Sequence, residues 1–280
     1  MNDKLENRVL ENRVLENWVL ENWVLDILAD PLTKLPAGPD AIGITNGIVD
    51  ARRYLPNTIG FGVWSSGQKF YEDWNRNTIE DYRAEVEADT PVYDRIRMCG
   101  RVLDVGGGPG TVRHFLPDDV QFLSIDPFID QWSAVPPAKM AVYPCLAKPL
   151  NFIAGCAEFL PLQAHSFDWV HMRSMIDHVY SPDLALIEAR RVLKPRGKLV
   201  IGLYVDGGKT GRRPPDRKIK ELARPILVAA GFKRFKDHHV FHPTFAHLQK
   251  LITDNGFAIT DVYWQPAWRD QVCYISACSS

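Results

Sequence analysis

The sequence lacks any run of about 18 uncharged apolar residues, so it predicts no membrane-spanning helix. It has little net charge, a formal −1 at pH 7, which argues against a general polyanion-binding surface and predicts no nucleic-acid partner. The five cysteines form no CxxC pair and are odd in number, which indicates a reduced, cytoplasmic protein. The first residues lack the basic start and apolar core of a secretory signal, so we expect none.

The composition is that of a globular protein, with 46% hydrophobic and 24% charged residues in 280. A chain of this length can bury roughly 75% of its unfolded surface, so we expect one large domain or a domain with a cap.

Four five-residue repeats, ENRVL, ENRVL, ENWVL and ENWVL, occupy residues 6–25. A step of five advances an α-helix by about 140° and reverses the face of a strand, so neither structure gains one continuous apolar face. We interpret residues 1–29 as an N-terminal tail, helical or partly disordered, with no chemical role. The alternative is a self-association element, which would give a homo-oligomer through residues 6–25.

Residues 30–95 are expected to form an N-terminal cap or lid, irregular at first and then helical. Proline, glycine and asparagine are frequent in residues 30–70, and two helices are predicted at about 69–87 and 90–99. Residues 72–94 contain eight Asp and Glu against two Arg, which is typical of a solvated helical face.

From residue 96 to 280 short apolar strands alternate with helices. Strands are predicted at 101–105, 120–126, about 152–153, 167–172 and 198–205, with helices at 181–194 and 244–254 and two further strands at the end. Ser181 is the expected N-cap of the first of these helices. The alternation predicts an α/β fold with a doubly wound, mostly parallel sheet and an antiparallel pair at one edge. Residues 206–243 interrupt this alternation, and we expect them to form a lid insertion.

The strand at 101–105 runs into a turn that contains Gly106, Gly107, Gly108 and Gly110. Glycines allow backbone N–H groups to approach a ligand closely, because there is no Cβ in the way. Asp104 precedes them, a poor neighbour for a pyrophosphate but a reasonable one for an ammonium group. Asp126 ends the next strand 22 residues later, and its carboxylate can accept hydrogen bonds from two ribose hydroxyls.

Four motifs in this order resemble the class I S-adenosylmethionine-dependent methyltransferases, specifically their small-molecule group with a UbiE-like core (methyltransferase type 11). The motifs are VLDVGGGPG, LSID, GCAEFLPLQAHSFDWV and MIDHVYSPDLALIEARRVLKPRGKLVI, within residues 100–205. The resemblance implies a seven-stranded Rossmann-like core, S-adenosyl-L-methionine as cofactor and methyl transfer to a small-molecule acceptor by in-line SN2 attack.

The same resemblance implies the cofactor-binding residues. Gly106, Gly108 and Gly110 would line the methionine and ribose, and Asp126 would hold the ribose hydroxyls. Cys156 stands where the family usually has Asp, and a thiol accepts only weakly from the adenine amino group. The full set is Asp104, Gly106, Gly107, Gly108, Gly110, Asp126, Pro127, Cys156, Ala157, Glu158 and Arg173.

A hydroxyl acceptor would need a general base. His178 follows the fourth strand at the sheet edge where open α/β folds bind ligands, and it resembles a histidine common there in the family. A structural role is the alternative. His239 and His242 are further candidates on the acceptor side.

The insertion contains ten Lys and Arg against three Asp and Glu in residues 207–237, which suits either an anionic acceptor or a solvated surface. His238, His239, His242 and His247 invite a metal interpretation, but Pro243 is adjacent and only Asp237 is at hand to complete a ligand set. We therefore expect no metal.

Two other functions remain open at this point. A nicotinamide-dependent oxidoreductase would keep the glycine turn and Asp126 but would leave the motifs at 157–197 unexplained. A non-catalytic binding or assembly protein would keep the fold and use the repeats for association.

Overall fold

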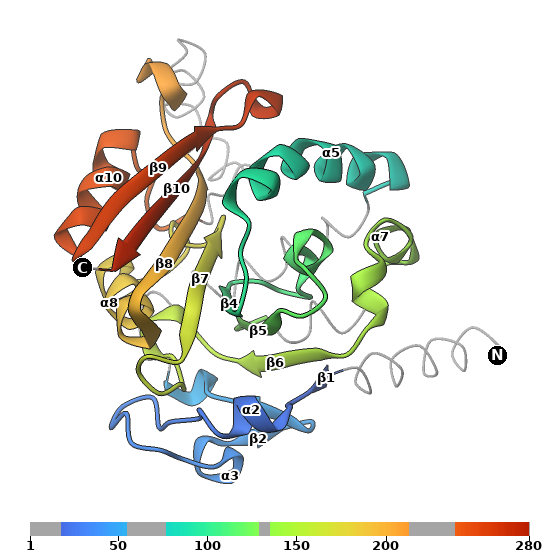
Figure 1. The fold of residues 1–280 in the computed structure, drawn as a ribbon, viewed down its shortest axis with the longest axis vertical. Helices are drawn as coiled ribbons and strands as arrows, with labels where there is room; N and C mark the ends of the chain where they lie inside the picture. Colours follow the sequence, from blue (N-terminus) through green and yellow to red (C-terminus); the bar gives the residue numbers. More distant parts are fainter. Residues whose placement is uncertain (1–17, 55–76, 129–134, 213–238, 280) are drawn as a thin grey trace, which may run out of the picture.

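A computed structural model describes residues 18–54, 77–128, 135–212 and 239–279 of the chain. Within these ranges one sheet runs through the molecule (Figure 1). Its seven central strands, in spatial order, are β6 (Leu150–Ala154), β5 (Gln121–Asp126), β4 (Arg101–Val105), β7 (Phe167–Arg173), β8 (Leu193–Tyr204), β10 (Val272–Ser279) and β9 (Phe257–Trp264). The first five are parallel, and β10 pairs antiparallel with β8 and β9. The predicted sheet is confirmed.

Helices cover both faces of this sheet. Successive side chains of a strand point to opposite faces. Leu103 and Met172 lie in one buried cluster with residues of α8 (Pro182–Val192) and α10 (Phe245–Asp254). Val102 and Trp169 lie in a second cluster with residues of α5 (Ile79–Ile96). Figure 1 shows α8 and α10 on one side of the sheet and α5 on the other, so the core has two layers.

The long helices begin where a side chain accepts a hydrogen bond from an otherwise free N–H group. The Ser181 hydroxyl accepts from the N–H of Leu184 at 3.3 Å, as predicted. The Thr244 hydroxyl accepts from the N–H of His247 at the start of α10. Thr78 and Asp81 form a capping box at the start of α5.

One helix, α5, stands where the sequence predicts two, at about 69–87 and 90–99. Residues 69–76 lie outside the described residues, and from Ile79 the helix continues through Pro91 to Ile96. Proline removes a helical hydrogen bond and usually marks a break. Tyr93 packs against the sheet after Pro91, however, and Tyr82 packs against Tyr143 before it, so buried contacts on both sides keep the helix continuous.

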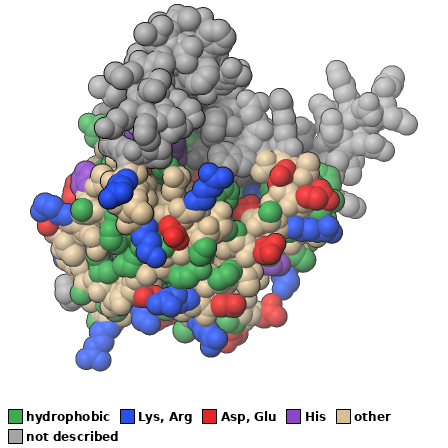
Figure 2. Space-filling model, turned by 90° about the horizontal axis from the view of Figure 1, so that it is seen from above, with side chains coloured by type: hydrophobic (Ala, Val, Ile, Leu, Met, Phe, Trp, Pro, Cys, Tyr) green, Lys and Arg blue, Asp and Glu red, His purple; other side chains and the backbone are tan. Residues whose placement is uncertain are grey.

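Short elements fill the connections. They are α7 (Pro137–Val142), η1 (Arg52–Tyr54), η2 (Thr111–Phe115), η3 (Pro144–Ala147), η4 (Ala157–Phe159), η5 (Gly208–Thr210) and η7 (Pro266–Trp268). No helix in the described part of the chain combines the length and apolarity needed to cross a membrane. On the face drawn in Figure 2, basic and acidic side chains of the described residues are interspersed.

The N-terminal segment adds three short strands to the outer edge of β6. β1 (Trp18–Val19) pairs in parallel with the beginning of β6, and β3 (Ile48–Asp50) pairs in parallel with its end. β2 (Ile44–Thr45) forms an antiparallel hairpin with β3. Between β1 and β2 lie α2 (Asn22–Leu25) and α3 (Pro39–Ile42).

Residues 18–29 are therefore not a separate tail, which corrects the sequence-based expectation. Val24 and Leu28 are buried in the core on the α8 side of the sheet, and Trp18 stacks on Phe152 with ring centroids 4.6 Å apart. Apolar side chains on more than one side of the segment explain why it packs. Residues 6–17 lie outside the described residues, so self-association through residues 6–25 stays a prediction, as do the boundaries at residues 29 and 95.

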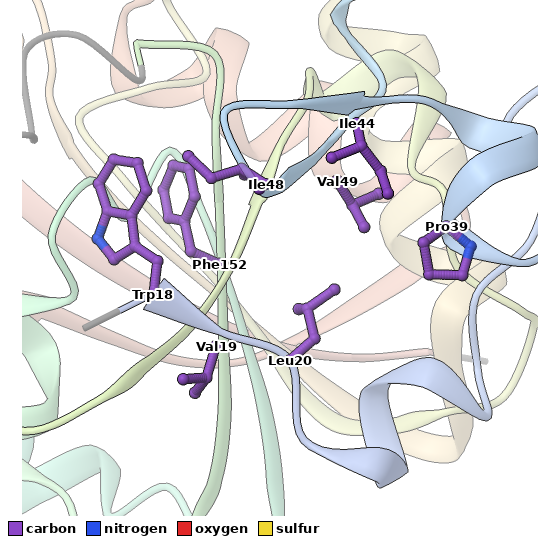
Figure 3. Close-up of a pocket in the computed structure, with 9 residues that line it drawn as sticks. Trp18, Val19, Leu20, Pro39, Ile44, Ile48, Val49 and Phe152 are labelled. Carbon is purple, nitrogen blue, oxygen red and sulfur yellow. The ribbon is translucent and has the colours of Figure 1, made fainter. Parts of the chain in front are cut away.

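A pocket of about 220 Å³ lies between β1 and the β2–β3 hairpin (Figure 3). Phe152 lies between the parts of β6 that pair with β1 and with β3, so the pocket is the gap between these two strands. Its lining contains no charged side chain and consists of Trp18, Val19, Leu20, Pro39, Ile44, Gly47, Ile48, Val49 and Phe152.

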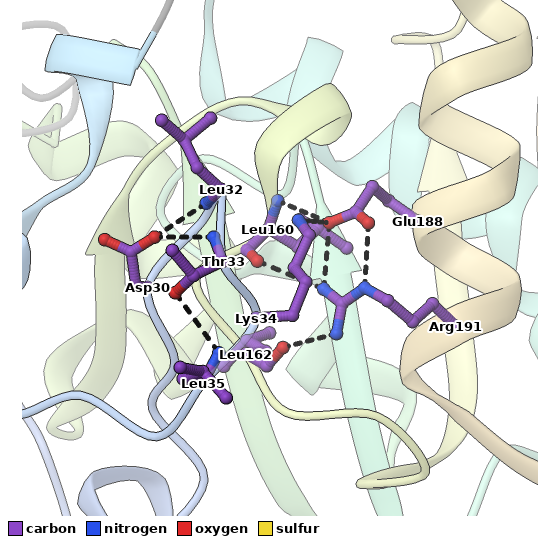
Figure 4. A network of polar contacts seen from close by, with 9 residues as sticks. All are labelled: Asp30, Leu32, Thr33, Lys34, Leu35, Leu160, Leu162, Glu188 and Arg191. Atoms are coloured by element: carbon purple, nitrogen blue, oxygen red, sulfur yellow. Dashed lines mark hydrogen bonds and ion pairs between the residues drawn. The ribbon is translucent and has the colours of Figure 1, made fainter.

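A buried charge network joins the N-terminal segment to α8 (Figure 4). Glu188 is 4% exposed and accepts hydrogen bonds from Lys34 Nζ at 2.7 Å and from the N–H of Leu160 at 3.0 Å. The Arg191 guanidinium binds both Glu188 oxygens and the carbonyls of Leu160 and Leu162. A buried carboxylate needs such partners to offset its lost hydration.

Replacing Leu28 by Ala tests whether this segment belongs to the core. Leu28 is 1% exposed, so we expect the free energy of unfolding to fall by about 2–5 kcal/mol. Leu32 is 62% exposed, and Leu32→Ala is the matched control with an expected change within about 0.5 kcal/mol. Urea unfolding measures both, and equal small losses would mean that residues 18–29 contribute nothing to the core.

Candidate active site

Polar side chains replace apolar ones toward the carboxyl ends of the strands, on the face that α5 covers. Val102, Phe122 and Trp169 occupy the first halves of β4, β5 and β7 on this face. Farther along the same strands, still on this face, the side chains are Asp104, Ser124, Asp126, His171 and Arg173. The carboxyl edge of an open α/β sheet is where ligands bind, so this polar cluster marks the candidate site.

The glycine turn after β4 requires glycine for both conformation and space. Gly106, Gly108 and Gly110 have φ angles of 72°, 51° and 76°, in the left-handed region that side chains rarely adopt. A Cβ on Gly107 would collide with the carboxylate of Asp104, and one on Gly106 would collide with Met175. The turn is thus a cradle of bare backbone at the end of β4.

Asp126 ties this turn to β5. Its Oδ2 accepts from the N–H of Gly108 at 3.1 Å and its Oδ1 accepts from the N–H of Phe128 at 2.8 Å. The Ser124 hydroxyl donates to the carbonyl of Gly108 at 2.9 Å. Asp126 is 4% exposed, so the structure puts a buried carboxylate against the glycine cradle, next to Pro127.

Asp104, His171 and Tyr93 form a buried chain of hydrogen bonds beneath the cradle. His171 Nδ1 lies 2.7 Å from Asp104 Oδ1, and His171 Nε2 lies 3.1 Å from the Tyr93 hydroxyl. Burial raises the pKa of Tyr93 well above its ordinary value, so the phenol keeps its proton. Both ring nitrogens of His171 therefore have a buried partner, Asp104 at Nδ1 and Tyr93 at Nε2.

Arg173 is held by acidic residues of α5. It forms ion pairs with Asp89 and, at 3.7 Å, with Glu85, which lie one helical turn apart. Gln265 Nε2 donates to the second Asp89 oxygen at 2.9 Å. The predicted cofactor contact of Arg173 stays a prediction, while its guanidinium fixes α5 over the end of β7.

The segment after β6 contains the predicted adenine-side residues. Cys156 and Ala157 are buried, and burial raises the pKa of the Cys156 thiol far above its ordinary value, so the group stays a neutral thiol. Glu158 Oε1 accepts from the N–H groups of Tyr180 and Ser181, at 2.9 and 3.3 Å. The Glu158 carboxylate therefore positions the turn before α8, and an adenine contact there stays a prediction.

The three candidate bases lie together at the same edge. The rings of His178 and His239 have centroids 4.5 Å apart, and those of His239 and His242 are 5.1 Å apart. Asp177, which the sequence did not single out, joins them, with 3.9 Å from its Oδ1 to His178 Nε2 and 3.7 Å from its Oδ2 to His239 Nε2. His238 and residues 213–237 lie outside the described residues.

His171, Tyr93 and Asp89 are the other residues of this region that the sequence analysis missed. His171 and Arg173 follow Trp169 with a spacing of two, so the strand alternation alone would put them on one face. Tyr93 and Asp89 differ by one helical turn, which puts them on one face of α5. The pairing of these two faces depends on the tertiary fold.

Residues 103–201 match the family model of a methyltransferase domain. A curated protein of Schizosaccharomyces pombe named an uncharacterized methyltransferase is 28% identical over 134 residues, which are 43% of this chain and 48% of that protein. The ubiquinone/menaquinone biosynthesis C-methyltransferase UbiE of Shewanella frigidimarina is 25% identical over 221 residues, 74% of this chain and 78% of that protein. The match thus spans about half the length of the first relative.

The crystal structure of an S-adenosylmethionine-dependent methyltransferase from Thermotoga maritima has the same fold. It superposes with a TM-score of 0.53 and 18% identity, over 79% of this chain and 100% of that one.

Tyr93→Phe tests the buried chain of hydrogen bonds. It removes the partner of His171 Nε2, and we expect the free energy of unfolding to fall by about 0.5–1.5 kcal/mol in urea unfolding. Tyr180 is 56% exposed, and Tyr180→Phe is the control, expected to change stability by less than about 0.5 kcal/mol. Identical unfolding curves for Tyr93→Phe and wild type would show that the contact contributes nothing.

Proposed function

The chain contains a methyltransferase domain of the class I S-adenosylmethionine-dependent type, and from this premise we propose that it transfers a methyl group from S-adenosyl-L-methionine to a small-molecule acceptor. The observation that supports this most is the buried Asp126 carboxylate against the bare-backbone turn of Gly106–Gly108. This carboxylate can accept hydrogen bonds from the two ribose hydroxyls of a nucleoside.

The glycine turn and the buried carboxylates beside it fit this cofactor in two respects. The glycine turn carries no side chains, because a Cβ on Gly106 or Gly107 would collide with Met175 or Asp104, and two buried carboxylates, Asp104 and Asp126, border it. Asp126 would hold the ribose hydroxyls, and Asp104 provides negative charge for the ammonium group of the methionine part. S-adenosyl-L-methionine, when bound, supplies a methyl group already activated on a sulfonium. A nicotinamide dinucleotide fits less well, because the pyrophosphate would lie near Asp104.

The chain's own task is then to position the acceptor and to exclude water. Alignment of the two reactants for in-line attack lowers a barrier by roughly 7–11 kcal/mol. A hydroxyl acceptor also needs a base, worth about 10²–10⁴-fold. His178, His239 and His242 are the candidates, and Asp177 is close enough to orient the first two.

An anionic acceptor is proposed from the basic residues of the insertion, and a cytoplasmic location from the cysteine pattern.

Calorimetric titration with S-adenosylhomocysteine and with NADH tests the proposal. We expect micromolar binding of the first alone, and Asp126→Asn should weaken it about 10- to 100-fold, because hydrogen bonds to a charged group contribute about 1.5–3 kcal/mol. Asp118→Asn is the control, since the Asp118 side chain is 95% exposed and precedes the amino end of β5, whereas Asp126 ends that strand.

Binding of NADH alone would overturn the proposal in favour of an oxidoreductase. Binding of neither compound would favour a non-catalytic role for the fold. An unchanged affinity of Asp126→Asn would remove the ribose contact from the proposal.

A further inference from the structure

Asp177, His178 and His239 converge from two segments that are about 60 residues apart in the sequence. The first segment is the turn after β7, and the second leads into α10. The N–H of Val240 donates to the carbonyl of Asp177 at 2.7 Å, so a backbone hydrogen bond fixes the two segments against each other. The side chains therefore meet because the main chain holds them there.

The donor atoms of the three side chains are arranged around a common centre. One ligand atom from each residue lies within 4.8 Å of the other two. Donors that share one Zn²⁺ ion at about 2.0–2.2 Å are roughly 3.3 Å apart. The Asp177–His178 and Asp177–His239 separations of 3.9 and 3.7 Å are too long for hydrogen bonds and need only a small side-chain rotation to reach that value.

The Asp177 carboxylate is buried, and within the described ranges one of its oxygens has no hydrogen-bond partner, which favours a cation beside it. The residue is 6% exposed, and its Oδ1 has no hydrogen-bond partner among the residues that the structure describes. A buried, unsatisfied carboxylate oxygen is costly, and native proteins rarely keep one without an ion or a water. A metal ion between Asp177 and the two imidazoles would satisfy this oxygen.

The imidazole rings of His178 and His239 lie side by side, with centroids 4.5 Å apart, so both can face one metal ion. Two nitrogens and one carboxylate oxygen suit Zn²⁺, Co²⁺ or Fe²⁺ better than Mg²⁺ or Ca²⁺, which prefer oxygen ligands. Three protein ligands leave at least one coordination position open, as in catalytic metal sites.

We propose that Asp177, His178 and His239 form a binding site for a divalent transition-metal ion of the Zn²⁺ type. The site goes beyond the proposed function, and with a metal bound His178 and His239 act as ligands and not as general bases. Met175 connects this site to the glycine turn, because it packs against Gly106 and its carbonyl accepts from the N–H of His178 at 2.9 Å.

The test is a calorimetric titration of the chelator-treated full chain with Zn²⁺. A Cys99→Ser background removes the exposed thiol, which could bind zinc on its own. We expect one equivalent to bind, and His239→Ala and Asp177→Asn each to weaken binding about 100-fold or more, since each removes one of three ligands. His247→Ala is the control and should bind like the background, because this exposed histidine lies outside the cluster.

Thermal unfolding provides a second measurement. Zn²⁺ should raise the unfolding temperature of the background and of His247→Ala but not of His239→Ala, since an ion that binds only the folded state stabilises it. If circular dichroism shows that Asp177→Asn does not fold, the zinc affinities of His178→Gln and His239→Ala provide the test.

Equal zinc affinity of the background and the cluster variants, or no binding at all, would overturn the metal site. Because the titration contains no nucleoside, failure of the metal site and failure of the proposed function give separate results.

Discussion

The carboxylates of Asp89, Asp104, Asp126 and Asp177 are among those buried around the carboxyl ends of the parallel strands. A buried carboxylate needs a donor or a cation nearby, and each of the first three has one from another part of the chain. Asp104 binds His171, Asp126 binds the Gly108 N–H, and Asp89 binds Arg173 and Gln265. These contacts hold the glycine turn to β5 and α5 to β7. Asp177 differs, because the nearest nitrogens that the described residues place against its carboxylate, those of His239 and His178, lie 3.7 and 3.9 Å away, beyond hydrogen-bond distance.

The strands and the glycine turn could be predicted because their signals are local. The runs at 101–105 and 120–126 are short and apolar, and the structure places β4 and β5 there almost residue for residue. Asp126 follows from its position at a strand end. The partner of Asp177 could not be predicted in this way, because His239 is 62 residues farther along and only the fold brings them together. The continuity of α5 through Pro91 likewise depends on packing against the sheet.

The pentapeptide repeats show how strongly context decides structure. Two identical copies of ENWVL, residues 16–20 and 21–25, contribute to different elements, since Trp18 lies in β1 and Trp23 in α2. Trp18 packs in the cluster on the α5 side of the sheet, and Trp23 packs against the cluster on the α8 side, edge-on to Phe167. A five-residue step gives no single apolar face, which is a disadvantage for a free helix. At the edge of β6 it allows one segment to contact both faces.

The turn after β7 connects the glycine cradle to the histidine cluster. Gly106 has no side chain, so Met175 occupies the space where a Cβ would be, and the same turn carries Asp177 and His178 two and three residues later. Ser174 enters this turn with a φ of 50°, and its N–H donates to the carbonyl of Gly202 at 2.8 Å, which anchors the turn to β8. A shift of the cradle would therefore press on Met175 and move the turn that carries Asp177. The glycine turn and the histidine cluster are thus joined through Met175, which can lie against the turn because Gly106 has no side chain.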